Sequence, residues 1–248
     1  MPFSRRALLV SLPAAAATVV LAQPAYATTL EQQSPIALRH ATAVRRPDLP
    51  AIEVDYPTSV DLRVRYVSKD SPTGCGIRGP EETIEAAPPA GAAAVVLDGR
   101  RYELRQFHFH TPSEHTVDGR RAALKQHFVH AGPDGETLVI GVLLDGGGRG
   151  GGAADRALAR VPQECGVEVE VAGVDLDAAL PRDLTTFRYT GSLTTAPFTE
   201  PVLWNVLARR GHVAASTVDA FRGVFPEGNA RKTQPLNGRQ VWLRPQHR

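Results

Sequence analysis

Most periodic segments of the chain alternate between apolar and polar residues. The clearest are residues 60–66 (VDLRVRY), 102–110 (YELRQFHFH) and 167–171 (VEVEV). Successive side chains of a strand point to opposite faces, so a period of two predicts half-buried strands. Residues 138–144 (LVIGVLL) are apolar at nearly every position, which predicts a central strand covered on both faces.

Turn and helix signals complete the predicted architecture. Asp98-Gly99 follows the apolar residues 94–97, and both residue types tolerate the positive φ angles of a hairpin turn. Helix candidates are short: residues 153–161, and residues 216–225 with Ser216 as N-cap. The pattern predicts a mainly β (α+β) fold, a single domain built on a large twisted, mostly antiparallel sheet with short peripheral helices.

The N-terminus has the pattern of a signal peptide. Arg5 and Arg6 precede a short apolar stretch that ends in the small-residue site Ala25-Tyr26-Ala27. The apolar run is shorter than the roughly 20 residues that cross a membrane. We therefore expect residues 1–27 to be removed, residues 28–248 to form the folded domain, and the chain to be exported without a stable membrane anchor. The arginine pair is compatible with the twin-arginine route, and an ordinary signal is the equal alternative.

The composition and net charge of the chain limit the kinds of molecule that we expect it to bind. Hydrophobic residues make up 42% of the chain and charged residues 22%, as in soluble globular proteins. The net charge of +2 is accounted for by the two leader arginines, so nucleic acid is not an expected partner. Cys75 and Cys165 are the only cysteines; they can form one bridge in an oxidising compartment. Oligomeric state is left open.

A histidine cluster supplies the candidate chemistry. Its members are His108, His110, His115, His127 and His130. His108 and His110 share one face of a predicted strand, and the strand-like segment around His127 can pair with it in antiparallel fashion. Three imidazoles with an open fourth position form the ligand set of catalytic zinc. The alternative is a half-buried strand whose histidines only pack; the third histidine and the absence of a CxxC pair favour zinc.

Three blocks of the sequence resemble the alpha-class carbonic anhydrases. They are residues 33–36 (QSPI), 106–118 (QFHFHTPSEHTVD) and 189–195 (YTGSLTT), with weaker matches at Pro197, Glu200, Trp204 and residues 234–239. The resemblance implies a bacterial, exported enzyme that converts carbon dioxide reversibly to bicarbonate and a proton by zinc-bound hydroxide. It also implies Zn²⁺ on His108, His110 and His127, with carbon dioxide and bicarbonate as the small-molecule substrates.

The same resemblance implies roles for other residues. Thr194 would hold the hydroxide and pass its own hydroxyl proton toward Glu114, which accepts it. Gln106 and the Gly238 backbone would hold ligand rings by their second nitrogen, and His115 would support the site from behind the ligands. The pocket for carbon dioxide would be formed by Val129, Val139, Leu193, Thr195 and Trp204.

The sequence departs from the family at positions that affect turnover. Lys125 stands two residues before His127, where the family carries a glutamate that accepts a hydrogen bond from that ring; a protonated lysine only donates. The exposed histidine that shuttles protons in fast members falls on Glu82. Phe198 replaces a cysteine that many bacterial members use. We therefore also consider a carbonic-anhydrase-like binding protein with impaired or no turnover and, less favoured, an unrelated three-histidine hydrolase.

Overall fold

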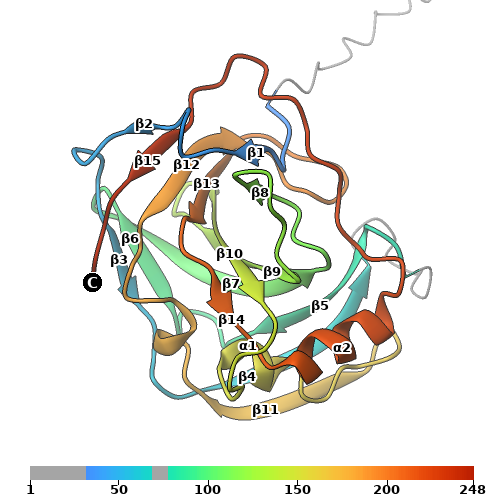
Figure 1. Ribbon diagram of the computed structural model, residues 1–248. Coiled ribbons are helices and arrows are strands. Elements are labelled where there is room, and N and C mark those ends of the chain that lie inside the picture. The colour runs from blue at the N-terminus through green and yellow to red at the C-terminus, as the bar shows by residue number, and fades with distance from the viewer. Residues whose placement is uncertain (1–31, 69–77) are drawn as a thin grey trace, which may run out of the picture.

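The computed structural model describes residues 32–68 and 78–248. The expected signal peptide and Cys75 lie outside the described residues. A large twisted sheet dominates the described part, with two small helices at its lower edge in Figure 1. The strands are β1 (Ala37–Leu38), β2 (Val44–Arg45), β3 (Ile52–Asp55), β4 (Val60–Ser68), β5 (Glu82–Ala87), β6 (Ala94–Leu97), β7 (Arg100–His110), β8 (Thr116–Val117), β9 (Leu124–Ala131), β10 (Thr137–Asp145), β11 (Glu168–Val174), β12 (Thr186–Gly191), β13 (Val202–Leu207), β14 (Gly211–His212) and β15 (Trp242–Arg244).

Strand order in the main sheet is β11-β4-β5-β7-β9-β10-β13-β12-β15-β2, with β3, β6 and β14 attached beside this path. Most neighbours are antiparallel; within the described residues the exceptions in this sheet are β10–β13, β10–β14 and β15–β2. The mainly β fold expected from the alternating pattern is confirmed. The apolar segment at residues 138–144 lies in β10, which has neighbours on both edges and is buried along most of its length.

Each face of the sheet carries its own apolar cluster. Phe107, Phe109 and Phe128 belong to the larger cluster, which also takes up the helices. Val139 and Trp204 belong to the second cluster, on the opposite face. Because residues alternate along β7, His108 and His110 point away from the phenylalanines and toward the second cluster. The alternation of side chains along β7 thus places the two histidines on one face of the sheet and the larger apolar core on the other.

The helices are shorter or begin earlier than expected. Helix α1 (Ala153–Ala157) stops before Val161, a 3₁₀ turn η1 (Asp177–Ala179) follows β11, and helix α2 (Ala215–Val224) begins after Ala214. The expected N-cap at Ser216 is therefore wrong. The next residue, Thr217, donates a hydrogen bond from its hydroxyl to the Asp155 carboxylate of α1 at 2.5 Å. The start of α2 is therefore positioned by its contact with α1 and not by a capping side chain within α2.

Cys165 is disulfide-bonded, and within the described residues there is no free cysteine. The only other cysteine in the sequence is Cys75. No helix within the described ranges is long and apolar enough to span a bilayer.

Candidate metal centre

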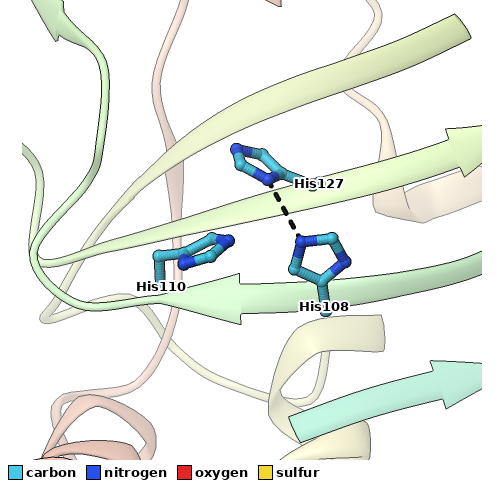
Figure 2. Close-up of side chains that lie close together, drawn as sticks. All are labelled: His108, His110 and His127. Carbon is cyan, nitrogen blue, oxygen red and sulfur yellow. Dashed lines mark hydrogen bonds between the residues drawn. The ribbon is translucent and has the colours of Figure 1, made fainter. Parts of the chain in front are cut away.

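Three histidines from two neighbouring strands meet on one face of the sheet. His108 and His110 lie two residues apart near the end of β7, and His127 of β9 is the register partner of His108. Figure 2 shows the three rings turned toward one another. One nitrogen from each ring lies within 4.8 Å of the others, and the side chains are 7%, 0% and 1% exposed, respectively.

The partners of the first two rings fix which nitrogen faces the centre. His110 Nδ1 lies 3.0 Å from the Asn229 carbonyl oxygen, which only accepts, so Nδ1 carries the hydrogen and Nε2 keeps its lone pair. His108 Nδ1 lies 2.9 Å from Gln106 Oε1, which imposes the same tautomer. His110 Nε2 is buried without a hydrogen-bond partner, as expected of a nitrogen reserved for a metal.

His127 presents its other nitrogen. Its Nδ1 lies 3.3 Å from His108 Nε2, and its Nε2 lies 3.6 Å from Glu114 Oε2. The carboxylate favours a hydrogen on Nε2, which leaves the Nδ1 lone pair directed at the centre. Burial, followed by the charge of His110, lowers the pKa of His127 well below its usual value. Three neutral rings with converging lone pairs match the donor set of tetrahedral zinc.

Glu114 lies at the centre of the polar groups behind the ligands. Its side chain is 0% exposed, and Oε1 accepts a hydrogen bond from the Arg231 backbone N–H at 3.0 Å. Oε2 has no hydrogen-bond partner. Within the described residues no hydrogen bond joins Glu114 to Thr194, which is 5% exposed. Among the charged or titratable side chains, the carboxylate lies 3.6 Å from His127 Nε2 and 3.6 Å from His110 Nδ1.

Lys125 is fully buried beside this carboxylate. It shares a face of β9 with His127, is 0% exposed, and its Nζ has no hydrogen-bond partner. Burial lowers the pKa of Lys125 to about 7, against the opposing effect of the Glu114 charge. Space for the amine comes from Gly141 on β10, where an added Cβ would lie 2.9 Å from Lys125 Nζ.

A hydrogen-bond chain links the three sequence blocks behind the ligands. His115 Nε2 lies 2.7 Å from the Tyr189 hydroxyl, which lies 2.9 Å from Ser34 Oγ. Ser34 Oγ accepts from the Ser192 backbone N–H at 3.1 Å. The His115 ring also packs on Trp204, with ring centres 4.8 Å apart. The QSPI and YTGSLTT blocks therefore brace the loop that carries Thr194.

Four of the five side chains expected to form a carbon dioxide pocket gather in one cluster. Val139 and Trp204 are buried there, and Val129 and Leu193 pack against them. Trp204 also contacts the His127 ring, with centres 4.9 Å apart. Thr195 is partly exposed, and its carbonyl accepts from the Phe198 backbone N–H at 2.9 Å. An apolar wall thus stands directly beside the histidines.

Two expectations about the site are contradicted by the structure. Glu82 is 2% exposed, so it is not the exposed group expected for proton transfer; its carboxylate accepts from the Tyr66 hydroxyl and the Arg78 backbone N–H. It shares its face of β5 with the core residue Ile84, whereas Glu85 on the other face is the register partner of His108. The carbonyl that holds a ligand ring is that of Asn229, not Gly238.

Asn229 is the supporting residue that sequence reasoning missed. Its carbonyl holds His110, its Oδ1 accepts from the Thr111 backbone N–H at 2.8 Å, and its Nδ2 donates to the carbonyls of Glu82 and Phe109. The preceding Gly228 has φ +79°, and a Cβ there would lie 2.5 Å from the Thr111 carbonyl oxygen. The glycine-asparagine pair after α2 is the one local signal for this close approach.

This geometry defines a mononuclear zinc site of the catalytic type on a large β-sheet. The model of the eukaryotic-type carbonic anhydrase family matches residues 23–245. The chain therefore belongs to this family, whose members are zinc enzymes that hydrate carbon dioxide.

Relatives and solved structures agree with that assignment. The carbonic anhydrase of Neisseria gonorrhoeae is 33% identical over 86% of this chain and 78% of its own. That of Pectobacterium carotovorum is 38% identical over 59% of this chain and 60% of its own. The Thermovibrio ammonificans alpha-carbonic anhydrase, solved with the inhibitor sulfanilamide, has a TM-score of 0.73 at 33% identity and 86% and 87% coverage. Dioscorin complexed with ascorbate has a TM-score of 0.73 at 26% identity, with 87% and 86% coverage.

Proposed function

We propose that this chain catalyses the reversible hydration of carbon dioxide at a zinc ion held by His108 Nε2, His110 Nε2 and His127 Nδ1. The orientation of these rings carries the proposal. The hydrogen-bond partners of His108 and His110, and the Glu114 carboxylate beside His127 Nε2, leave one lone pair of each ring directed at a common point. Zinc on three imidazoles supplies a water of pKa about 7, as is general for this class of enzyme, and hence a nucleophile at neutral pH.

Residues around the metal centre would exclude water and orient the attacking oxygen. Val139, Leu193 and Trp204 exclude water from the side where an apolar substrate would approach the attacking oxygen. Thr194 would accept the hydrogen of that oxygen and so direct its lone pair at the carbon atom of the substrate. The loop holding Thr194 is anchored by the Trp204 Nε1–H, which donates to the Ser192 carbonyl at 2.9 Å.

We propose that Glu114 is the outer partner of the His127 ring in this chain. Lys125 occupies the position of the acceptor that the family uses, and Glu114 Oε2 is the carboxylate oxygen found 3.6 Å from His127 Nε2. At that distance the contact is electrostatic and not a formed hydrogen bond. A ligand ring that lacks a full outer partner typically binds zinc about 10 to 100-fold more weakly. The proposal therefore includes a weaker zinc site than the family norm.

A non-catalytic binding role is the second candidate, favoured by one observation. The buried Lys125 amine places a potential positive charge beside the ligands, and such a charge opposes a zinc cation. The dioscorin structure contains ascorbate, which gives this fold a precedent for binding other small molecules. Both candidate functions use the same arrangement of histidines, so only a measurement of carbon dioxide hydration distinguishes them.

Zinc content and carbon dioxide hydration, measured on the same preparation, test the proposal. About one zinc per chain together with rapid hydration in stopped flow would support it. Zinc without hydration would support the binding role, and no zinc after expression in zinc-supplemented medium would refute both. Added sulfanilamide should suppress hydration if turnover occurs at the metal, and residual hydration under saturating inhibitor would point to a contaminant.

We further propose that the protein is bacterial and is exported after removal of residues 1–27. The basic pair Arg5-Arg6, the short apolar stretch and the Ala25-Tyr26-Ala27 site support it. Expression of the full chain in a Gram-negative host, followed by fractionation and mass determination, tests it: a periplasmic product that begins at Thr28 is expected. Arg5→Lys combined with Arg6→Lys should block export only on the twin-arginine route. Unprocessed protein in the cytoplasm would contradict the proposal.

A further inference from the structure

Arg231 lies two residues after Asn229, the residue that holds the His110 ring. The Asn229 carbonyl contacts His110 Nδ1, and the Arg231 backbone N–H donates to Glu114 Oε1 at 3.0 Å. One short segment after α2 therefore holds both a ligand ring and the carboxylate behind the ligands. Both contacts are made by backbone atoms, so the Arg231 side chain is left to bind other partners.

The guanidinium of Arg231 is held in its own plane by two acceptors. Its Nη1 donates to the Ser34 carbonyl at 2.6 Å, and its Nη2 donates to Gln33 Oε1 at 2.9 Å. Both acceptors belong to the QSPI block of the sequence. The N–H groups of a guanidinium lie in its plane, so these two bonds leave its faces available for stacking. A lysine amine has no such planar face.

One face of this guanidinium lies on the ring of Phe198. Arg231 Cζ is 3.7 Å from the ring centre, well inside the roughly 6 Å at which an aromatic face attracts a cation. Phe198 has φ +59°, in the left-handed region that a bulky side chain rarely adopts. A residue persists in such a conformation only where its surroundings hold it there. The stack with Arg231 is one of these restraints.

Backbone hydrogen bonds link Phe198 to Thr194 within the segment that joins β12 to β13. The Phe198 N–H donates to the Thr195 carbonyl at 2.9 Å, and the Leu193 N–H donates to the Thr199 carbonyl at 2.9 Å. These two bonds enclose Thr194, whose side chain is 5% exposed. The position of the Phe198 ring is therefore coupled to the position of the Thr194 hydroxyl.

We propose that Arg231 is a positioning residue for the hydration reaction, and that its stack on Phe198 sets the place of Thr194 relative to Glu114 and the ligand rings. Its backbone N–H holds the carboxylate, and its side chain holds the segment that carries the hydroxyl. Arg231 acts through these groups and does not contact the substrate. The inference rests on the proposed function, in which Thr194 orients the attacking oxygen.

Amide hydrogen exchange of the zinc-loaded protein tests the stack without any need for turnover. Arg231→Lys keeps the charge and the backbone N–H to Glu114 but loses the planar face. We expect the Leu193 and Phe198 N–H groups to exchange about tenfold faster, the effect of losing a partly buried cation–π contact, with unchanged zinc content. Exposed Arg63→Lys is the matched control and should change neither. Wild-type exchange at both groups in Arg231→Lys would overturn the proposal, and so would loss of zinc.

Variants at Phe198 distinguish the stack from general packing. Phe198→Leu keeps an apolar side chain and should loosen the segment as Arg231→Lys does, whereas Phe198→Tyr keeps the aromatic face and should exchange near the wild-type rate. In the double variant Arg231→Lys with Phe198→Leu the two effects should not add, because each removes the same contact. Fully additive effects, or equally fast exchange in Phe198→Tyr and Phe198→Leu, would refute the assignment.

Hydration kinetics then connect the stack to the reaction. Arg231→Lys and Phe198→Leu should each lower kcat/KM by about 10 to 100-fold, the range expected when a reacting group is misplaced. The midpoint of the pH profile of kcat/KM should stay where it is, because orientation is impaired and ionisation is not. A shifted midpoint, or wild-type kcat/KM in both variants, would overturn the positioning role. A wild type that binds zinc but hydrates no carbon dioxide would instead refute the proposed function, and the exchange experiment would still decide whether the stack holds Thr194.

Discussion

Replacement of Lys125 by methionine tests the energetics of the metal centre most directly. The folded protein holds the amine at 0% exposure and lowers its pKa from 10.5 to about 7. Between these two values the unfolded chain binds the proton and the folded chain does not, so the free energy of unfolding should rise with pH across this window. Below pH 7 the folded state carries the full penalty of a buried charge, an upper bound of about 5 kcal/mol at 1.36 kcal/mol per pKa unit.

Methionine has a similar length and no charge, so Lys125→Met removes that penalty. We expect the variant to exceed the wild type in stability by a few kcal/mol at pH 6.5, in line with the gain of about 1–4 kcal/mol when buried ions give way to apolar groups. The difference should shrink steadily toward pH 9.5, where both side chains are neutral in the folded state.

Urea denaturation at several pH values measures this difference. EDTA in every sample removes the contribution of metal binding, and exposed Lys232→Met serves as the matched control, with no pH-dependent difference expected. A stability difference between Lys125→Met and wild type that stays constant from pH 6.5 to 9.5 would refute the argument, because it would show that the amine does not change its charge in this window.

Three further predictions concern the ligands and the proton path. His110→Ala should lose zinc and hydration activity together, and exposed His40→Ala should keep both; elemental analysis showing wild-type zinc in His110→Ala would contradict the ligand set. Glu114→Gln should weaken zinc binding by about 10 to 100-fold, because the amide can turn an N–H toward His127; competition with a chromophoric chelator measures this, and an unchanged dissociation constant would disprove the role of the carboxylate. Glu82→His should not raise turnover in dilute buffer, because that side chain faces the interior, whereas added imidazole should raise kcat with little change in kcat/KM. Faster turnover of the folded variant would show that the position does reach the centre.

Period-two patterning predicted the strands and the convergence of His108, His110 and His127, because alternation along a strand fixes the face on which each side chain lies. The family resemblance placed Gln106 correctly behind His108, and the alternation explains the contact, since residues two apart share a face. These are local consequences of the backbone, so they can be obtained from a single sequence.

Contacts between distant segments could not be predicted in this way. Asn229 reaches His110 across 119 positions; the Gly228-Asn229 pair signals a close backbone approach, but it does not say which residue is approached. Glu82 was expected to be exposed because it aligns with the exposed shuttle histidine of the family, but Tyr66 from the neighbouring strand donates a hydrogen bond to its carboxylate and the side chain is buried. The start of α2 was misplaced for the same reason, since Asp155 of α1 determines it and the local sequence does not.

The hydrogen bond between the His110 ring and the Asn229 carbonyl also determines when, during synthesis of the protein, the zinc site becomes complete. His108, His110 and His127 are all synthesised early, but the ring of His110 is oriented by a residue that leaves the ribosome near the end of translation. Nascent chains emerge N-terminal end first, so the complete ligand set is assembled only after the segment that follows α2 has docked. Zinc acquisition should therefore be a late, post-translational event, and a chain that crosses a membrane unfolded would have to obtain its metal in the compartment where it arrives.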